Sequence, residues 1–231
     1  MNYKVPIWGF FYWVKFMKNE VGFHVPVRPM PPDWIFEMGT PNFVPAPELW
    51  EWIRKVFLDP KSKLFNPDHM HLRSFRYPDI AVMWARSGFK KQGRQVIGTT
   101  EKVMINAGGW KKERQEEQFI QWFNYLPEYL ITFDASYSRI ASDVNFCALV
   151  EHELYHIAHK KDQYGTPAYN RETGMPKLAI QGHDVEEFTG VVRRYGASED
   201  VMRIVEAANK RPQLSRADVH YACGTCNLKV V

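Results

Sequence analysis

The sequence predicts an α+β fold in which helices pack on a small mixed sheet. Two segments, Ile80–Arg86 and Gln95–Met104, are rich in strand-forming residues and predict neighbouring strands joined by a long connection, and Tyr129–Asp134 predicts a third strand. Helices are predicted before, between and after these strands, because apolar residues recur there at three- and four-residue steps. With 231 residues, of which 45% are hydrophobic, the chain can bury a sizeable core, so one principal domain is expected.

The composition divides the chain into three parts. Residues 1–47 are aromatic at first and then rich in proline, which disfavours long helices and predicts an extended arm lying over the body. Residues 48–212 form the predicted domain, which opens with a helix that begins near Leu49 and ends before Pro60. Residues 213–231 form a short tail.

Charge and cysteine content narrow the class of protein. A net charge of +4 is too small to indicate nucleic-acid binding by itself. The densest basic cluster is expected to be a solvated hairpin tip rather than a phosphate-binding patch. Its members are Arg86, Lys90, Lys91 and Arg94. Three cysteines cannot form a secreted disulfide framework, so a cytoplasmic location is expected. The apolar stretch Val5–Val14 is too short to span a bilayer, so no membrane association is expected.

The most informative feature is a His-Glu-x-x-His pattern formed by His152, Glu153 and His156. Residues four apart on a helix face the same side, so the two histidines can bind one metal ion while Glu153 reaches its bound water. The pattern lies in a predicted helix that Ser142 or Asp143 caps and that carries an apolar stripe on the side away from the histidines. The stripe consists of Phe146, Val150, Leu154 and Ile157. This placement favours a zinc site over a surface helix with two solvated histidines.

The same helix is predicted to continue to Lys160 and Lys161, which suit its negative end, and to stop before Gly165. His159 would then lie on the histidine face, about 10 Å along the axis from His152. That separation is too large for one ion, so His159 is expected to be a neighbour of the site and not a ligand.

A catalytic zinc site needs a third protein ligand. A second predicted helix, from Gly182 to Gly196, carries four residues with suitable donor atoms. They are His183, Asp184, Glu186 and Glu187. Because a neutral imidazole suits zinc well, His183 is the preferred ligand, whereas Glu187 lies one turn later and could replace it or orient it. Asp184 and Glu186 stay open as weaker alternatives, or as residues that favour the positive end of the helix.

These residues predict hydrolysis by a metal-activated water. Zinc would polarise a substrate carbonyl, and Glu153 would take a proton from the water and pass it to the departing amine. Tyr195 or Tyr164 could donate a hydrogen bond to the developing oxyanion, and the spacing does not select between them. If the strand at residues 129–134 lies at a sheet edge, it could pair with an extended peptide substrate.

Three segments together resemble a known protein family. His152–His156, Gly182–Phe188 and Arg193–Gly196 resemble the putative phage metallopeptidase family and, more distantly, the SprT-like proteases, over about residues 66–226. The resemblance implies a minimal zincin-like domain, in which a small mixed sheet packs on the His-Glu-x-x-His helix and on a following ligand helix. It also implies a zinc metallopeptidase encoded by a phage or prophage.

A second, structural metal ion is a further possibility raised by the tail. Cys223 and Cys226 form a Cys-x-x-Cys turn, which is half of a common four-ligand zinc site, and His220 lies three residues earlier. A distant residue or a second copy of the chain would have to complete the site, and sharing between two copies would make the protein a homodimer. The alternatives are two free thiols or a labile disulfide.

Two other functions remain open from the sequence. One is a metal-stabilised interaction protein that antagonises a host factor without peptidase activity, although the presence of Glu153 argues against a purely structural site. The other is a protease tethered to DNA, as SprT-like proteases are, through the basic loop and the C-terminal cysteines.

Overall fold

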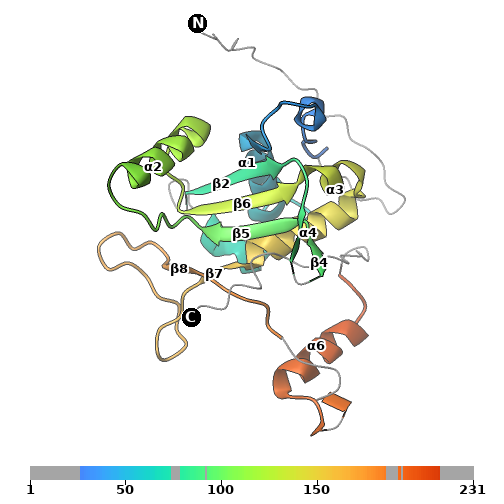
Figure 1. Ribbon diagram of the computed structural model, residues 1–231. Helices are drawn as coiled ribbons and strands as arrows, with labels where there is room; N and C mark the ends of the chain where they lie inside the picture. Colours follow the sequence, from blue (N-terminus) through green and yellow to red (C-terminus); the bar gives the residue numbers. More distant parts are fainter. Residues whose placement is uncertain (1–26, 74–78, 92, 186–191, 194, 214–231) are drawn as a thin grey trace, which may run out of the picture.

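A four-stranded mixed sheet forms the centre of the computed structural model, which describes residues 27–73, 79–91, 93–185, 192–193 and 195–213 (Figure 1). The strands lie in the order β1 (Phe43–Pro45), β2 (Ile80–Ala85), β6 (Tyr129–Asp134) and β5 (Gly98–Lys102). β2 and β6 are parallel, whereas β1 pairs antiparallel with β2 and β5 pairs antiparallel with β6. The predicted α+β class and small mixed sheet are therefore present.

The prediction that the strands at Ile80–Arg86 and Gln95–Met104 are neighbours is wrong. β2 and β5 are not adjacent, because β6 lies between them. The two central strands are nearly continuous apolar runs buried on both faces, as expected of parallel partners inside a sheet. β5 has no continuous apolar run, and it carries exposed charges at its end, which suits an edge position.

The connection between β2 and β5 contains a small hairpin. β3 (Phe89–Lys91) and β4 (Arg94–Val96) pair antiparallel, and Gly93 in the turn adopts a φ of 78° that other residues rarely take. Lys90, Lys91 and Arg94 of the basic cluster therefore lie in a hairpin as predicted, whereas Arg86 lies outside it and donates to Thr40.

Helices cover the two faces of the sheet unequally. One face packs against α1 (Pro47–Ile53), the π-helical turn at Arg54–Leu58 and α4 (Asp143–Tyr155), in the main hydrophobic core. The other face packs against α2 (Gly109–Phe123) in a smaller cluster around Ala81, Met83 and Leu130. The sheet thus separates α4 from α2 (Figure 1).

The start of α4 is fixed by two independent contacts. α3 (Ala135–Ile140) follows β6 directly, and the Ser142 side chain then caps α4 by accepting a hydrogen bond from the backbone N–H of Asn145. The buried Arg28 donates to the Asp143 carboxylate at 3.0 Å, and its guanidinium lies 4.3 Å from the centre of the Phe146 ring. Arg28, which belongs to the predicted N-terminal arm, therefore packs against the domain.

The end of α4 differs from the prediction. The helix stops at Tyr155, and the chain enters β7 (Ile157–His159), which pairs antiparallel with β8 (Leu178–Ile180). His159 and the two lysines after it therefore do not lie on the helix. The periodic pattern extended through Ile157 because that residue is fully buried, but its burial comes from a strand and not from a fourth helical turn.

Three further elements complete the described structure. A 3₁₀ segment at Pro67–Leu72 contacts α4, and α6 (Glu199–Asn209) follows the candidate site with no buried residue. A second 3₁₀ segment, at Asp33–Phe36, precedes β1 and buries Ile35. Among the helices of the described ranges, none is long and apolar enough to cross a membrane.

Low pH should destabilise the fold through protonation of His69, which lies in the 3₁₀ segment Pro67–Leu72. Its side chain is completely buried, neither ring nitrogen has a hydrogen-bond partner among the described residues, and burial lowers the pKa to about 4. The unfolded chain has the ordinary histidine pKa of about 6.5, so stability falls as the pH drops from there toward 4. Between pH 7 and pH 5 the metal-free protein should lose about 2 kcal/mol of unfolding free energy through this residue. Urea unfolding of wild type and His69→Phe at both pH values measures the loss, and an equal loss in the two proteins would contradict the assignment.

Candidate metal centre

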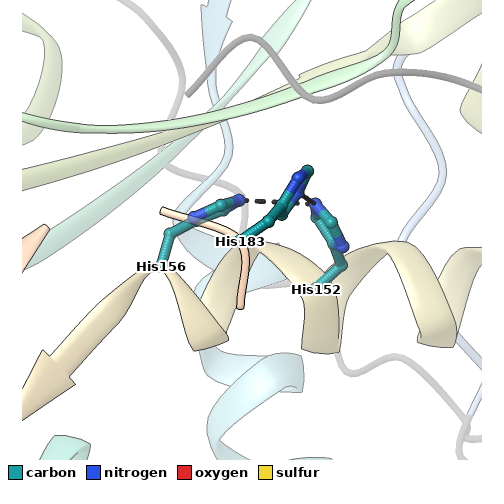
Figure 2. Close-up of side chains that lie close together, drawn as sticks. All are labelled: His152, His156 and His183. Carbon is teal, nitrogen blue, oxygen red and sulfur yellow. Dashed lines mark hydrogen bonds between the residues drawn. The ribbon is translucent and has the colours of Figure 1, made fainter. Parts of the chain in front are cut away.

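Three histidines from two distant parts of the chain converge at the end of α4 (Figure 2). His152 projects from the last turn of α4, His156 directly follows the helix as its C-cap, and His183 comes from the segment that follows β8. Their ligand atoms all lie within 4.8 Å of one another. The Nε2 atom of His152 is 3.3 Å from that of His156 and 3.1 Å from that of His183.

These distances fit a metal ion. Donor nitrogens bound tetrahedrally to zinc at 2.0–2.1 Å would lie about 3.4 Å from one another. Hydrogen bonding explains the contacts less well, because a neutral imidazole has one N–H and the Nε2 atom of His152 faces two other ring nitrogens. A cation among the three nitrogens would satisfy all of them at once.

The ring of His156 is already oriented for this role. Its Nδ1 atom lies 2.7 Å from the carbonyl oxygen of Gln181, which can only accept a hydrogen bond. Nδ1 therefore carries the proton, and Nε2 keeps its lone pair for a metal ion. The side chain is only 2% exposed, so the orientation is held inside the protein.

The loop that connects β7 to β8 accounts for the position of His183. Pairing of Ile157 with Ile180 returns the chain to the end of α4, and the backbone N–H of Gln181 then donates to the carbonyl oxygen of His156 at 2.9 Å. The long segment between the second and third histidines is thus a closed loop whose two ends are hydrogen-bonded. His183 lies two residues beyond that closure.

Glu153 lies between α4 and the edge strand β5. Its side chain is fully buried, and its Oε2 atom is 2.8 Å from the hydroxyl of Thr100. The same hydroxyl lies 2.9 Å from the Glu153 carbonyl oxygen, so its single proton can be donated to the side chain or to the backbone of this residue. A Cβ atom on Gly98 would overlap the Glu153 carboxylate, which shows how closely the strand approaches it.

A polar network holds the rear of α4. The amide of Asn66 donates to the Glu151 carboxylate at 2.9 Å and lies 3.0 Å from the Tyr155 hydroxyl. The Tyr155 hydroxyl in turn donates to Asp68 at 2.8 Å, and its ring packs edge-on against His69 at 4.5 Å. Burial raises the pKa of the Glu151 carboxyl. Glu151 and Tyr155, which precede the candidate ligands His152 and His156 by one residue each, are therefore hydrogen-bonded to the segment at Asn66 and Asp68.

The remaining predicted site residues have different outcomes. Asp184 is exposed, and its carboxylate lies 3.4 Å from the side-chain amide of Gln181, so it is outside the three-histidine cluster. Tyr164 and Tyr195 are 82% and 76% exposed, and their roles as oxyanion donors stay predictions. Five predicted residues lie outside the described ranges. They are Glu186, Glu187, His220, Cys223 and Cys226.

Two residues that contact Glu153, Thr100 and Gly98, were not predicted from the sequence. Thr100 gave no signal, because a threonine in a strand pattern is ordinary. Gly98 did give one, since a lone glycine in a strand often marks the close approach of another group.

Comparison with known proteins gives one match. Residues 50–209 match the model of a family described as "Putative phage metallopeptidase". Neither the curated proteins nor the solved structures contain a match.

Gly98→Ala should destabilise the protein, because the added methyl group would collide with the Glu153 carboxylate. Overpacking of this kind costs about 1–3 kcal/mol in unfolding free energy. Gly108→Ala is the matched control, since Gly108 has extended backbone and a methyl group added there would meet no described atom within 4 Å. Urea unfolding compares the three proteins, and equal stabilities would mean that Glu153 does not lie against β5.

Proposed function

The chain belongs to the putative phage metallopeptidase family, and we propose that it hydrolyses peptide bonds with a zinc ion held by His152, His156 and His183. The observation that carries the proposal is the convergence of three imidazole nitrogens at metal-ligand spacing, next to a glutamate on the same helix. Three protein ligands and one open position are the usual pattern of a catalytic zinc site. We further propose that the domain is a minimal zincin and that a phage or prophage encodes it.

Glu153 is the proposed general base. Zinc, when bound, polarises a substrate carbonyl and lowers the pKa of a water molecule toward neutrality. The Glu153 carboxylate takes a proton from the attacking water and then delivers it to the departing amine. Thr100 is a positioning residue in this scheme, because its hydroxyl lies at hydrogen-bonding distance from the Oε2 atom of the carboxylate and orients it.

The substrate is proposed to be an extended peptide that pairs with β5. β6 lies inside the sheet, so residues 129–134 do not meet the condition of an edge position and cannot pair with a peptide in this way. β5 occupies the edge instead, and the described residues include no strand paired with its outer side. The contact between Thr100 of this strand and Glu153 supports the assignment, because a peptide added to β5 would lie beside the proposed base.

Two substitutions separate metal binding from catalysis. Glu153→Gln should keep zinc but lose hydrolysis by at least about a hundred-fold, because an amide cannot accept the proton. His152→Ala should lose zinc as well, since two ligands hold the ion poorly. Zinc content by atomic emission and cleavage of unfolded casein provide the two measurements. Full activity of Glu153→Gln would refute the mechanism, and full zinc occupancy of His152→Ala would move the metal site elsewhere.

Thr100 can be tested with a pair of matched variants. Thr100→Val removes the hydroxyl at nearly constant volume and should lower kcat about ten-fold or more, because a hydrogen bond to a charged group is lost. KM and zinc content should change little. Thr100→Ser retains the hydroxyl and should stay close to wild type. If the valine and serine variants show the same kcat, the hydroxyl does not position the base.

A further inference from the structure

The sheet face opposite α4 is only half covered. Pairing in the sheet places Phe43, Ala85 and Asp134 in one row across the strands, and Thr132 and Thr99 pair on the same face two residues further along. α2 packs on this face around Ala81, Met83 and Leu130, and it also approaches β1. Ala85 and Asp134 lie outside the cluster that α2 covers.

A cavity of about 620 Å³ occupies this uncovered end. Its floor is formed by the sheet, from Phe43 and Ala85 across to Thr99 and Glu101 of β5, and the β3–β4 hairpin closes one end with Phe89 and other residues. Four consecutive residues of β5, from Gly98 to Glu101, line the cavity. They include both residues that contact Glu153, so the cavity adjoins the proposed catalytic site across a single strand.

We propose that this cavity is a specificity pocket that accepts a large apolar side chain, aromatic or long aliphatic, of the bound peptide. The inference rests on the proposed function in one respect, which is that the peptide pairs with β5. Side chains of an added strand alternate between the two faces of the sheet. Those that point away from α4 would stand beside Thr99 and Glu101, at the mouth of the cavity.

The lining determines the chemical class of the occupant. Phe43 and Phe89 are 48% and 53% exposed at the cavity, and Val96 and Ile97 supply further apolar surface. The Nη2 atom of Arg86 already donates to the hydroxyl of Thr40 at 2.7 Å and to its carbonyl oxygen, which holds the guanidinium against residue 40. One oxygen of Asp134 accepts from the backbone N–H of Tyr137, which commits that carboxylate to the cap of α3. Apolar atoms form the larger part of the cavity lining, beside the polar side chains of Thr99, Thr132 and Glu101.

Binding can be measured without relying on catalysis. The probe is the pentapeptide acetyl-Thr-Thr-Phe-Thr-Thr-amide, with the same peptide carrying alanine in place of phenylalanine as its control. Added at millimolar concentration to ¹⁵N-labelled, zinc-loaded Glu153→Gln, the phenylalanine peptide should shift the backbone amide signals of Phe89, Val96 and Thr99. The alanine peptide should shift these signals much less, because the apolar contact is missing. No shift around the cavity with either peptide would overturn the pocket.

A variant that fills the cavity from Ala85, at the part of the floor away from β5, provides the second measurement. Ala85→Trp leaves β5 unchanged, whereas Ile140→Trp places the same side chain at a position that is 83% exposed. Ala85→Trp should abolish the phenylalanine-dependent shifts, and Ile140→Trp should retain them. In cleavage assays, the ratio of kcat/KM for phenylalanine over alanine peptides should fall about ten-fold or more in Ala85→Trp alone. An unchanged ratio would overturn the pocket.

The two proposals fail in distinguishable ways. Absence of hydrolysis in wild type, with phenylalanine-dependent shifts around the cavity, would refute the peptidase and retain the pocket. Hydrolysis that depends on Glu153, without a preference that Ala85→Trp alters, would refute the pocket and retain the peptidase.

Discussion

The reciprocal contact between His156 and Gln181 is the constraint on which the candidate centre depends. One hydrogen bond joins the two backbones, and the other runs from the His156 ring to the Gln181 carbonyl. The first fixes where the returning chain meets α4, and the second fixes which ring nitrogen faces the other histidines. If α4 continued for another turn, neither bond could form. The early end of the helix is therefore part of how the site is assembled.

Different faces of α4 contact different parts of the structure. Phe146, Leu149, Val150 and Leu154 belong to the main hydrophobic core. Glu151 and Tyr155 bind the segment at Asn66 and Asp68, while Glu153 turns toward β5. Each contact restrains rotation of the helix about its axis, and such restraint is what keeps two histidines pointing at one position.

Local periodicity was sufficient to predict part of this arrangement. Helical spacing placed His152 and His156 on one face, and the preference of zinc for imidazole ranked His183 above its acidic neighbours. The strand segments and the Ser142 cap could also be predicted, because the sequence features that indicate them lie within a few residues of one another. These features all depend on short-range geometry.

Features that depend on distant partners were not predictable in the same way. The end of α4 at Tyr155 reflects pairing of β7 with β8, and the order of the strands reflects burial on both faces of β6. Thr100 meets Glu153 across 53 positions in the sequence, so no local pattern reveals the contact. A burial pattern alone could not distinguish a fourth helical turn from a short strand at Ile157.

An edge strand also carries a risk of self-association, since an extended chain can add to the backbone groups along its outer side. β5 is short, at five residues, and its last two side chains are Glu101 and Lys102. Lys102 forms an ion pair with Glu128 at 3.2 Å, which holds one charge near the end of the strand, and Glu101 is exposed. Two copies that met edge to edge would have to bring these charges together over a very short ladder. The same brevity that limits such aggregation leaves room for only a few residues of any peptide to align by backbone pairing.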